Sequence, residues 1–410
     1  MKKSNVFKII IYSSIILILL WLFYKFNYLP LLDSWFVDFK TNYQASYNYL
    51  NAPDLLYAIV PYNGGYTYPP IVSMVYSIFY IISNNFETAK LLWIFINYSV
   101  LILIIVLVYK FYYTKIDVKF FLLTLFIVFF KPLRDNLKYG NIKLILLFLF
   151  ILLHIFYDKK KYIWAGIVYG FLIVLSVQPI ILSFYFLIKK KYKFLIVAFC
   201  AVIILMFLAV AGANNKTELF YQTQKYIFVV VPNLFFEGAS AAPYIQSIDA
   251  MCKRLFLDYN EYTIELFKSH FLALKLPIII KLFFVVYTLA LLYKNRKCSN
   301  FEHSQLNLIF LMMVLIHSIN WEYHYTILIF SLLLIIKDYT LFENYRIPLF
   351  LMFFIIFLPI PYDNKIFLNA NILQLFVNIK LFALCAIWYI VFKKIRHCVP
   401  TAKLSSKLDV

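Results

Sequence analysis

Apolar residues occur in long blocks along the chain, and short connectors between the blocks carry most of the charges. Blocks such as residues 6–23, 91–109 and 194–211 approach the roughly 20 residues that an α-helix needs to cross a bilayer. The strands of a membrane barrel alternate polar and apolar residues, and these blocks do not alternate. The pattern predicts an all-α, polytopic membrane protein with about 12 transmembrane helices.

Two long polar stretches interrupt the apolar blocks, at residues 25–70 and 212–275. We expect both to be extracytoplasmic loops, and we expect the amphipathic runs at 217–230 and 247–257 to be helices that lie on the membrane. The sequence contains no fixed-period repeat and no low-complexity linker. The chain, residues 1–410, is therefore predicted to form a single membrane-embedded domain.

The first half of the chain can be threaded through a membrane in more than one way. Residues 68–82 form a short apolar run that opens with two prolines, which suit a helix start. The polar segment 131–143 separates two further short apolar runs. It is either a broken helix at membrane depth that lines a cavity, or an ordinary loop. A longer apolar run, residues 164–188, is interrupted by Gln178 and Pro179.

The charge distribution also indicates a membrane protein. Charged residues make up 14% of the chain, against about 25% in a typical soluble domain. The net charge of +20 comes from short lysine and arginine clusters between apolar blocks, as in cytoplasmic connectors that contact anionic lipids. We therefore expect no nucleic-acid partner. We expect a multi-pass protein of the bacterial plasma (inner) membrane, in contact with membrane lipids and with both termini cytoplasmic.

Sequence signatures of metal and cofactor sites are missing. The five cysteines are scattered and form no C-x-x-C pair. His317 and His324 are seven positions apart and could form a metal pair, but no third ligand is near them in sequence. No glycine-rich phosphate loop, H-E-x-x-H or G-x-S-x-G occurs. We expect neither a metal nor a cofactor.

The best candidate for chemistry is Asp38, in the first polar stretch. Its surroundings are too polar to face lipid and too rich in tyrosine to be a plain linker, and the glycine pair Gly64–Gly65 predicts a turn further along. A carboxylate beside aromatic side chains at a membrane surface suits a general base for a hydroxyl group. The alternative is that Asp38 caps an interfacial helix.

Three later segments contain further candidates. The connector 317–324, HSINWEYH, is dense in polar groups where a bare turn would suffice, although Trp and His also belong to the aromatic belts of membrane proteins. Arg134 and its neighbouring lysines could bind a phosphate, or they could be positive-inside charges. Lys253 and Arg254 lie on an expected interfacial helix, where they would contact either lipid head groups or a donor.

These pieces occur in an order that resembles the membrane-embedded C-type glycosyltransferases. The resemblance is closest to glycosyltransferase family 87, the polyprenol-phosphate-mannose-dependent α-mannosyltransferase-like proteins. The first polar stretch matches the family pattern at Asp38-Phe39, Tyr43, Ala45, Leu56-Tyr57 and Tyr68-Pro69-Pro70.

The later family motifs match in part. Where the family has Gly-Gln-x-Asn, this chain has Gly140-Asn141-Ile142-Lys143, and where it has Lys-Pro, this chain has Gln178-Pro179. A third element matches at Gln246-Ser247 with Arg254-Leu255. The family's Ser-Pro-x-Ser-Trp-x-His-His is reduced to a segment that retains Trp321 and His324.

The resemblance implies a fold, a reaction and a set of residues. The fold would be GT-C-like, and a sugar on a polyprenyl phosphate would pass, with inversion, to a glycolipid or glycan acceptor. Asp38 would deprotonate the acceptor hydroxyl, and His324 and Arg254 would stabilise the departing phosphate. The implied substrate-binding residues are Tyr43, Tyr57, Tyr68, Arg134, Asn141, Gln178, Gln246, Arg254, Trp321 and His324.

Two other classes of envelope protein share the broad pattern. An O-antigen polymerase or ligase also combines many spans with a large outer loop, but it relies on loop arginines, and Arg254 is the sole arginine at 212–275. A flippase or other transporter should place charges inside its spans, and the apolar blocks contain few. Both observations favour the transferase.

Overall fold

A computed structural model describes residues 36–57, 66–113, 117–232, 241–257, 268–298, 301–360 and 373–396. The first predicted span, the Gly64–Gly65 pair and both termini lie outside these residues. Within them the regular structure is helical, and two residues, Ile245 and Trp321, form an isolated antiparallel bridge. The predicted all-α class is confirmed.

Nine helical stretches are apolar enough to lie in a membrane. The five that are long enough to cross it are α5 (Phe86–Tyr112), α11 (Tyr192–Ala211), α15 (His270–Lys294), Tyr339–Phe357, which contains α18 (Arg346–Phe357), and Phe376–Arg396, which contains α20 (Ile379–Arg396). The four shorter ones are α4 (Pro70–Ile82), α6 (Val118–Phe129), α9 (Tyr162–Leu175) and Gln178–Ile188. These counts cover the described part of the chain, so the prediction of about 12 crossings stays a prediction.

Less apolar or fully enclosed helices fill the space between these stretches. They are α3 (Val37–Asn51), α7 (Lys131–Tyr139), α8 (Lys143–Asp158), α12 (Lys216–Lys225), α14 (Ile248–Phe256), α16 (Glu302–Leu315) and α17 (Leu328–Lys337). Three short helical segments lie between the longer helices. They are the 3₁₀ segments η3 (Gln178–Leu182) and η6 (Glu322–Ile327), and the π-helical segment η4 (Tyr226–Val230).

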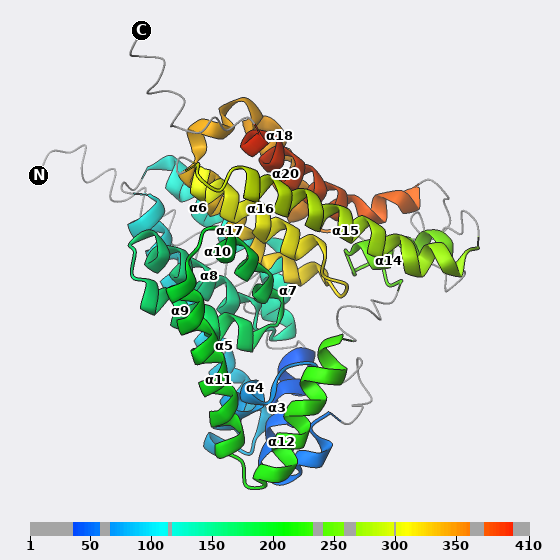
Figure 1. Cartoon of the computed structure of the whole chain (residues 1–410). Coiled ribbons are helices and arrows are strands. Elements are labelled where there is room, and N and C mark those ends of the chain that lie inside the picture. The colour runs from blue at the N-terminus through cyan, green and yellow to red at the C-terminus, as the bar shows by residue number, and fades with distance from the viewer. Residues whose placement is uncertain are drawn as a thin grey trace, which may run out of the picture.

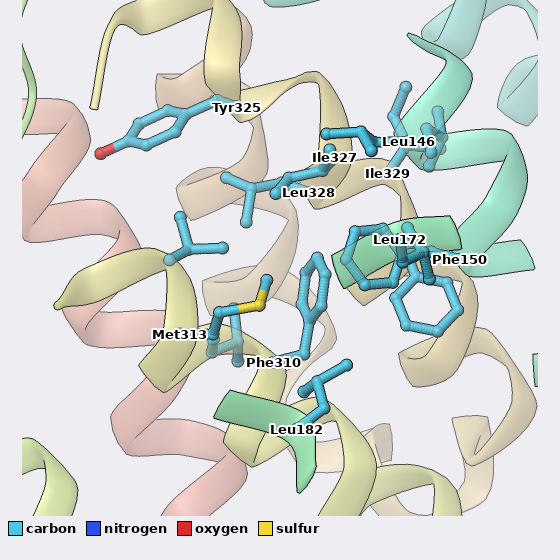
Figure 2. Packing of buried hydrophobic residues seen from close by; sticks show 14 of the residues in the cluster. Leu146, Phe150, Leu172, Leu182, Phe310, Met313, Tyr325, Ile327, Leu328 and Ile329 are labelled. Atoms are coloured by element: carbon cyan, nitrogen blue, oxygen red, sulfur yellow. The ribbon is translucent and has the colours of Figure 1, made fainter. Parts of the chain in front are cut away.

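The centre of the main body is α16, together with α8 and α17. Every residue of α16 from Ser304 to Leu315 is buried, and from Leu308 onward the helix is apolar on all sides, as expected of a helix enclosed by others. Figure 2 shows Phe310 and Met313 of α16 within a cluster that includes Phe150 of α8 and Leu328 of α17. This core holds the ends of α8 and η6 in fixed positions.

A smaller lobe of α3, α4 and α12 lies at one end of the molecule, and α11 runs from the main body into it (Figure 1). The hydroxyl of Tyr49 on α3 donates to the carbonyl of Ala209 at the end of α11, at 2.7 Å. The side chain of Leu219 on α12 is buried in the same lobe. The first polar stretch is thus docked onto the helices by specific contacts.

Two glycines allow α9 and α11 to lie close together. An added Cβ at Gly166 would be 2.9 Å from the carbonyl oxygen of Phe194, and one at Gly170 would be 2.6 Å from the Cβ of Ala201. The spacing of four residues is the small-residue pattern by which helices approach each other in membranes.

The structure decides the broken region in favour of helix. Residues 131–143 are not an ordinary loop, because they form α7, the turn at Gly140 and the start of α8. The predicted interruption at Gln178 is present, since α9 ends at Leu175 and η3 follows it. The amphipathic runs at 217–230 and 247–257 are helical, and their placement on the membrane stays a prediction.

Candidate active site around Asp38

Asp38 is the second residue of α3, and it does not cap the helix. The N-cap residue is Phe36, which makes no side-chain cap, so the capping interpretation is wrong. Phe36 has φ 44° and ψ 45°, a left-handed conformation that costs a bulky residue roughly 1–3 kcal/mol and concentrates at functional sites. The carboxylate of Asp38 is thereby free to face other parts of the chain.

Asn141 and Tyr323 hold the carboxylate from two sides. The amide nitrogen Nδ2 of Asn141 donates to Oδ2 of Asp38 at 2.8 Å and lies 3.5 Å from the hydroxyl of Tyr68. The amide oxygen of Asn141 accepts the backbone N–H of Lys143 at 3.1 Å, and this contact fixes which way the amide points. The hydroxyl of Tyr323 also hydrogen-bonds to Asp38.

The turn at Gly140 makes this contact possible. Gly140 has φ 69°, a conformation that is costly for any residue with a Cβ. An added Cβ would lie 2.6 Å from Cδ1 of Phe36 and 2.7 Å from Cβ of Phe39. The indole of Trp93 donates to the carbonyl of Gly140 at 3.0 Å. A glycine therefore lets the α7–α8 turn press directly against the first turn of α3.

The electrostatic surroundings suit Asp38 to accept a proton. Burial raises the pKa of its carboxyl above the usual value, and this effect exceeds the opposing effects of the Asn141 and Tyr323 hydrogen bonds and the Lys143 charge. Burial also raises the pKa values of Tyr68 and Tyr323, so both phenols stay protonated and can donate. Asp38 itself remains partly exposed. It can therefore meet a substrate from outside.

A cationic and imidazole-rich wall lies next to the carboxylate. The ammonium of Lys143, 4% exposed, donates to the side-chain oxygen of Gln178 at 3.3 Å. The rings of His317 and His324 stack with centroids 6.0 Å apart. Burial lowers the pKa of both imidazoles, and the Lys143 charge lowers it further, so both are neutral near pH 7. Burial lowers the pKa of Lys143 to about 8, so near pH 7 the wall offers one ammonium that is mostly protonated and two uncharged imidazoles.

Lys143 differs from the second lysine near His317. Lys281 pairs with Asp249 at 2.5 Å and donates to Ser318 at 2.7 Å. Among the described residues, Lys143 forms no ion pair with a carboxylate and bonds only to a neutral amide. Buried charges are normally paired. The Lys143 ammonium therefore interacts with the Asp38 carboxylate only at a distance.

An ionic network of Glu322, Lys380, Lys131 and Asp135 lies next to the site. Glu322 pairs with Lys380 of α20 and lies 3.4 Å from Lys131 of α7, which also pairs with Asp135. Glu322 precedes Tyr323, and α7 leads into the turn at Gly140. The network therefore fixes the two elements that supply hydrogen-bond donors to Asp38.

The structure brings about half of the sequence-predicted residues together. Tyr68, Asn141, Gln178 and His324 surround Asp38 or its cationic wall. Tyr57 lies one layer further out, where its hydroxyl donates to the carbonyl of Tyr68 at 2.8 Å.

Three other predicted residues, Tyr43, Gln246 and Arg254, form hydrogen bonds to other segments of the chain. The hydroxyl of Tyr43 donates to the carbonyl of Ser83 at 2.9 Å, within an aromatic cluster. Gln246 is fully buried, and its Nε2 donates to the carbonyl of Val377 at 2.8 Å. Arg254 is 1% exposed, and its guanidinium bonds to backbone carbonyls and to Asn378. Arg254 is enclosed by these partners, and its predicted contact with a donor phosphate stays a prediction.

Two predicted residues lie beside the site. Arg134 is a half-buried residue of α7, the helix that ends at the Gly140 turn. Trp321 is half-buried, and its ring stacks on that of Tyr244 with centroids 4.7 Å apart.

Sequence reasoning missed the contact between Tyr323 and Asp38. Tyr323 lies in the polar connector 317–324, but the connector contains several candidates and nothing in it singles out the tyrosine. Lys143 was predicted as one of the lysines near Arg134 that could bind a phosphate, and it also departs from the Gly-Gln-x-Asn pattern. Among the described residues, no group of three His, Cys, Asp or Glu side chains is placed to hold a metal ion.

The sequence matches a known protein family. A family model described as "Glycosyltransferase family 87" matches residues 66–318, more than half of the chain. No curated protein matches. The matched segment includes Tyr68, the Gly140 turn, Lys143, Gln178 and His317.

Replacement of Gly140 tests the turn. Gly140→Ala should destabilise the protein by about 2 kcal/mol or more, because alanine is strained at positive φ and its Cβ would overlap Phe36 and Phe39. The measurement is thermal unfolding in detergent. The matched control is Gly212→Ala, where φ is −79° and the nearest atom, the hydroxyl of Tyr49, is 3.1 Å from the added Cβ. Equal losses in the two variants would contradict the argument.

Proposed function

The chain belongs to glycosyltransferase family 87, and from this premise we propose that it transfers a mannose-like hexose from a polyprenyl-phosphate donor to a glycolipid or glycan acceptor. The chain is a glycosyltransferase with helices of membrane-spanning length. The donor, the acceptor and the roles of residues are our proposal. The single observation that carries it is the contact of Asp38 with Asn141 and Tyr323 beside the buried ammonium of Lys143.

The reaction is an inverting displacement with Asp38 as the general base. The acceptor oxygen bonds to the anomeric carbon while the bond from that carbon to the donor phosphate oxygen breaks. The proton of the acceptor hydroxyl passes to Asp38, whose raised pKa makes it a stronger base than an ordinary aspartate. The hydrogen bonds from Asn141 and Tyr323 hold the carboxylate in one orientation.

The leaving group needs positive charge and hydrogen-bond donors. The polyprenyl phosphate changes from a diester to a monoester as it leaves, so it gains one negative charge. Lys143 is a buried lysine that forms no ion pair among the described residues, and it lies within electrostatic range of both Asp38 and His324. We assign the phosphate to Lys143, Gln178 and His324. Arg254, which the family resemblance had suggested for this role, is enclosed by its own contacts.

The proposed reaction also implies an orientation of the protein in the membrane. Asp38 and the lobe of α3, α4 and α12 would lie on the extracytoplasmic side of the bacterial plasma membrane, with both termini in the cytoplasm. This placement follows from the lysine and arginine clusters between apolar blocks. The family match favours a glycosyltransferase over a polymerase, a ligase or a flippase.

The first test replaces the base. Asp38→Asn should lower the transfer rate by about 10²–10⁴-fold, because the amide cannot accept the proton although its oxygen can still accept the Asn141 hydrogen bond. Membranes that contain the variant are incubated with radiolabelled polyprenyl-phosphate mannose, and label in the acceptor fraction is counted. The control is Asp54→Asn, an exposed carboxylate in the same polar stretch. Near-normal transfer by Asp38→Asn would sink the assignment.

The pH dependence gives a second test. Asp38 must be ionised to act as the base, so kcat/KM should fall as the pH drops through its pKa, and the midpoint should lie above 3.8. Because the pKa is higher in the folded state, the ionised carboxylate destabilises the fold at neutral pH, and this cost vanishes in acid. Asp38→Asn should therefore leave the unfolding temperature at pH 7 unchanged or raised. An acid limb below pH 3.8, or a clear loss of stability at pH 7, would count against the proposal.

The third test moves the buried charge. Lys143→Asn should lower transfer by about 10²–10³-fold, the usual loss for one group that stabilises developing negative charge. The double variant Lys143→Asn/Gln178→Lys restores the Asn and Lys of the family motifs, and the two side chains are in contact. The double variant should therefore recover a large part of the rate. If it is no better than Lys143→Asn, the charge is not what this position supplies.

A further inference from the structure

Four aromatic rings form a row whose inner member Tyr323 contacts Asp38 and whose two end members, Tyr139 and Tyr244, are exposed. Tyr323, which hydrogen-bonds to Asp38, lies 5.1 Å from Tyr139 and 5.9 Å from Trp321, measured between ring centroids. Trp321 stacks on Tyr244 at 4.7 Å with an angle of 11° between the planes. Tyr139 ends α7, and Tyr244 precedes α14, so three segments far apart in the sequence contribute to the row.

Backbone hydrogen bonds join the segment that contains Tyr244 to the segment that contains Trp321. Ile245 and Trp321 form the isolated antiparallel bridge, and the N–H of Glu322 donates to the carbonyl of Tyr244 at 3.0 Å. The N–H of Gln246 donates to the carbonyl of Asn320 at 2.8 Å. The rings are therefore positioned by the backbone before any ligand binds, which lowers the entropic cost of binding.

The exposure of the rings increases away from Asp38. Tyr323 is 7% exposed, Trp321 is half-buried, Tyr139 is 37% exposed and Tyr244 is 42% exposed. The charges of Asp38, Asp135 and Lys131 all act on the Tyr139 hydroxyl. The row thus combines open aromatic surface with charged groups of both signs, next to the proposed base.

We propose that this row is the acceptor subsite for a second sugar ring, so that the acceptor is a glycan of at least two rings. This inference rests on the proposed function. A pyranose ring has an apolar C–H face that can lie against an aromatic ring, and its hydroxyls can bond to nearby carboxylates and ammonium groups. With the attacked ring at Asp38, the next ring of the acceptor would lie against Tyr139, Trp321 or Tyr244.

A membrane aromatic belt is the competing explanation for exposed Tyr and Trp. Belt residues lie at the level of lipid head groups and anchor a span through their own amphipathic rings. The rings of Tyr244, Trp321 and Tyr323 instead stack in succession, the ring of Tyr139 is tilted against that of Tyr323, and Tyr323 connects the row to Asp38 through a hydrogen bond. These features favour a ligand subsite.

The test compares two acceptors on the full chain in nanodiscs. The donor is polyprenyl-phosphate [¹⁴C]mannose, and the acceptors are octyl α-mannoside, with one ring, and octyl dimannoside, with two. The wild type should have a higher kcat/KM for the two-ring acceptor. Tyr244→Ala and Tyr139→Ala should each lower the ratio of the two kcat/KM values by about two- to tenfold, mainly through KM of the two-ring acceptor. The control is Tyr221→Ala, a 60% exposed tyrosine of α12 outside the row.

The outcomes separate this inference from the proposed function. Transfer to both acceptors with a ratio near one in the wild type, or an unchanged ratio in both row variants, overturns the subsite and leaves the transferase intact. Transfer to neither acceptor counts against the proposed function. In that case, saturation-transfer NMR of octyl dimannoside still tests the row. A saturation-transfer signal from octyl dimannoside that is present with the wild type and lost with Tyr244→Ala supports the acceptor subsite. An equal signal with the two proteins, or no signal with the wild type, refutes it.

Discussion

The hydrogen bond from Asn141 to Asp38 is the contact on which the proposed site depends. It joins the first turn of α3 to the turn between α7 and α8, across 103 positions of sequence. Gly140 allows the approach, Trp93 holds the turn by its carbonyl, and the Lys143 backbone orients the Asn141 amide. The same turn begins α8 and so places the Lys143 ammonium beside the carboxylate. One close backbone approach thereby sets the base and the cation relative to each other.

Hydrophobic periodicity was enough to predict the all-α class, the interruption at Gln178 and the short helices of the long polar loop. The order of short motifs was enough to identify the family, and the role of Asp38 stays a prediction. Residue type alone did not separate functional residues from structural ones. Arg254 and Gln246 have the right chemistry for a phosphate or a sugar, yet both bond to backbone carbonyls. Which carbonyls need a donor depends on the folded path of distant segments, and local patterns carry no information about that.

The contact between Lys143 and Gln178 links two positions at which the sequence departs from the family motifs. Read separately, each position departs from its motif, one by gaining a charge and the other by losing it. In the structure the two side chains meet at 3.3 Å, so the positive charge is kept in place and supplied from α8 instead of η3. Such an exchange is visible only when positions 35 residues apart are known to be neighbours.

The partial exposure of Asp38 has a consequence for the energetics of turnover. With Asp38 as the base, the proton that it takes from the acceptor can leave directly to water on the side of the membrane where α3 lies. No chain of titratable groups is required to carry that proton through the bilayer. Each catalytic cycle then moves no net charge across the membrane. On this mechanism the membrane potential would neither drive the transfer step nor oppose it.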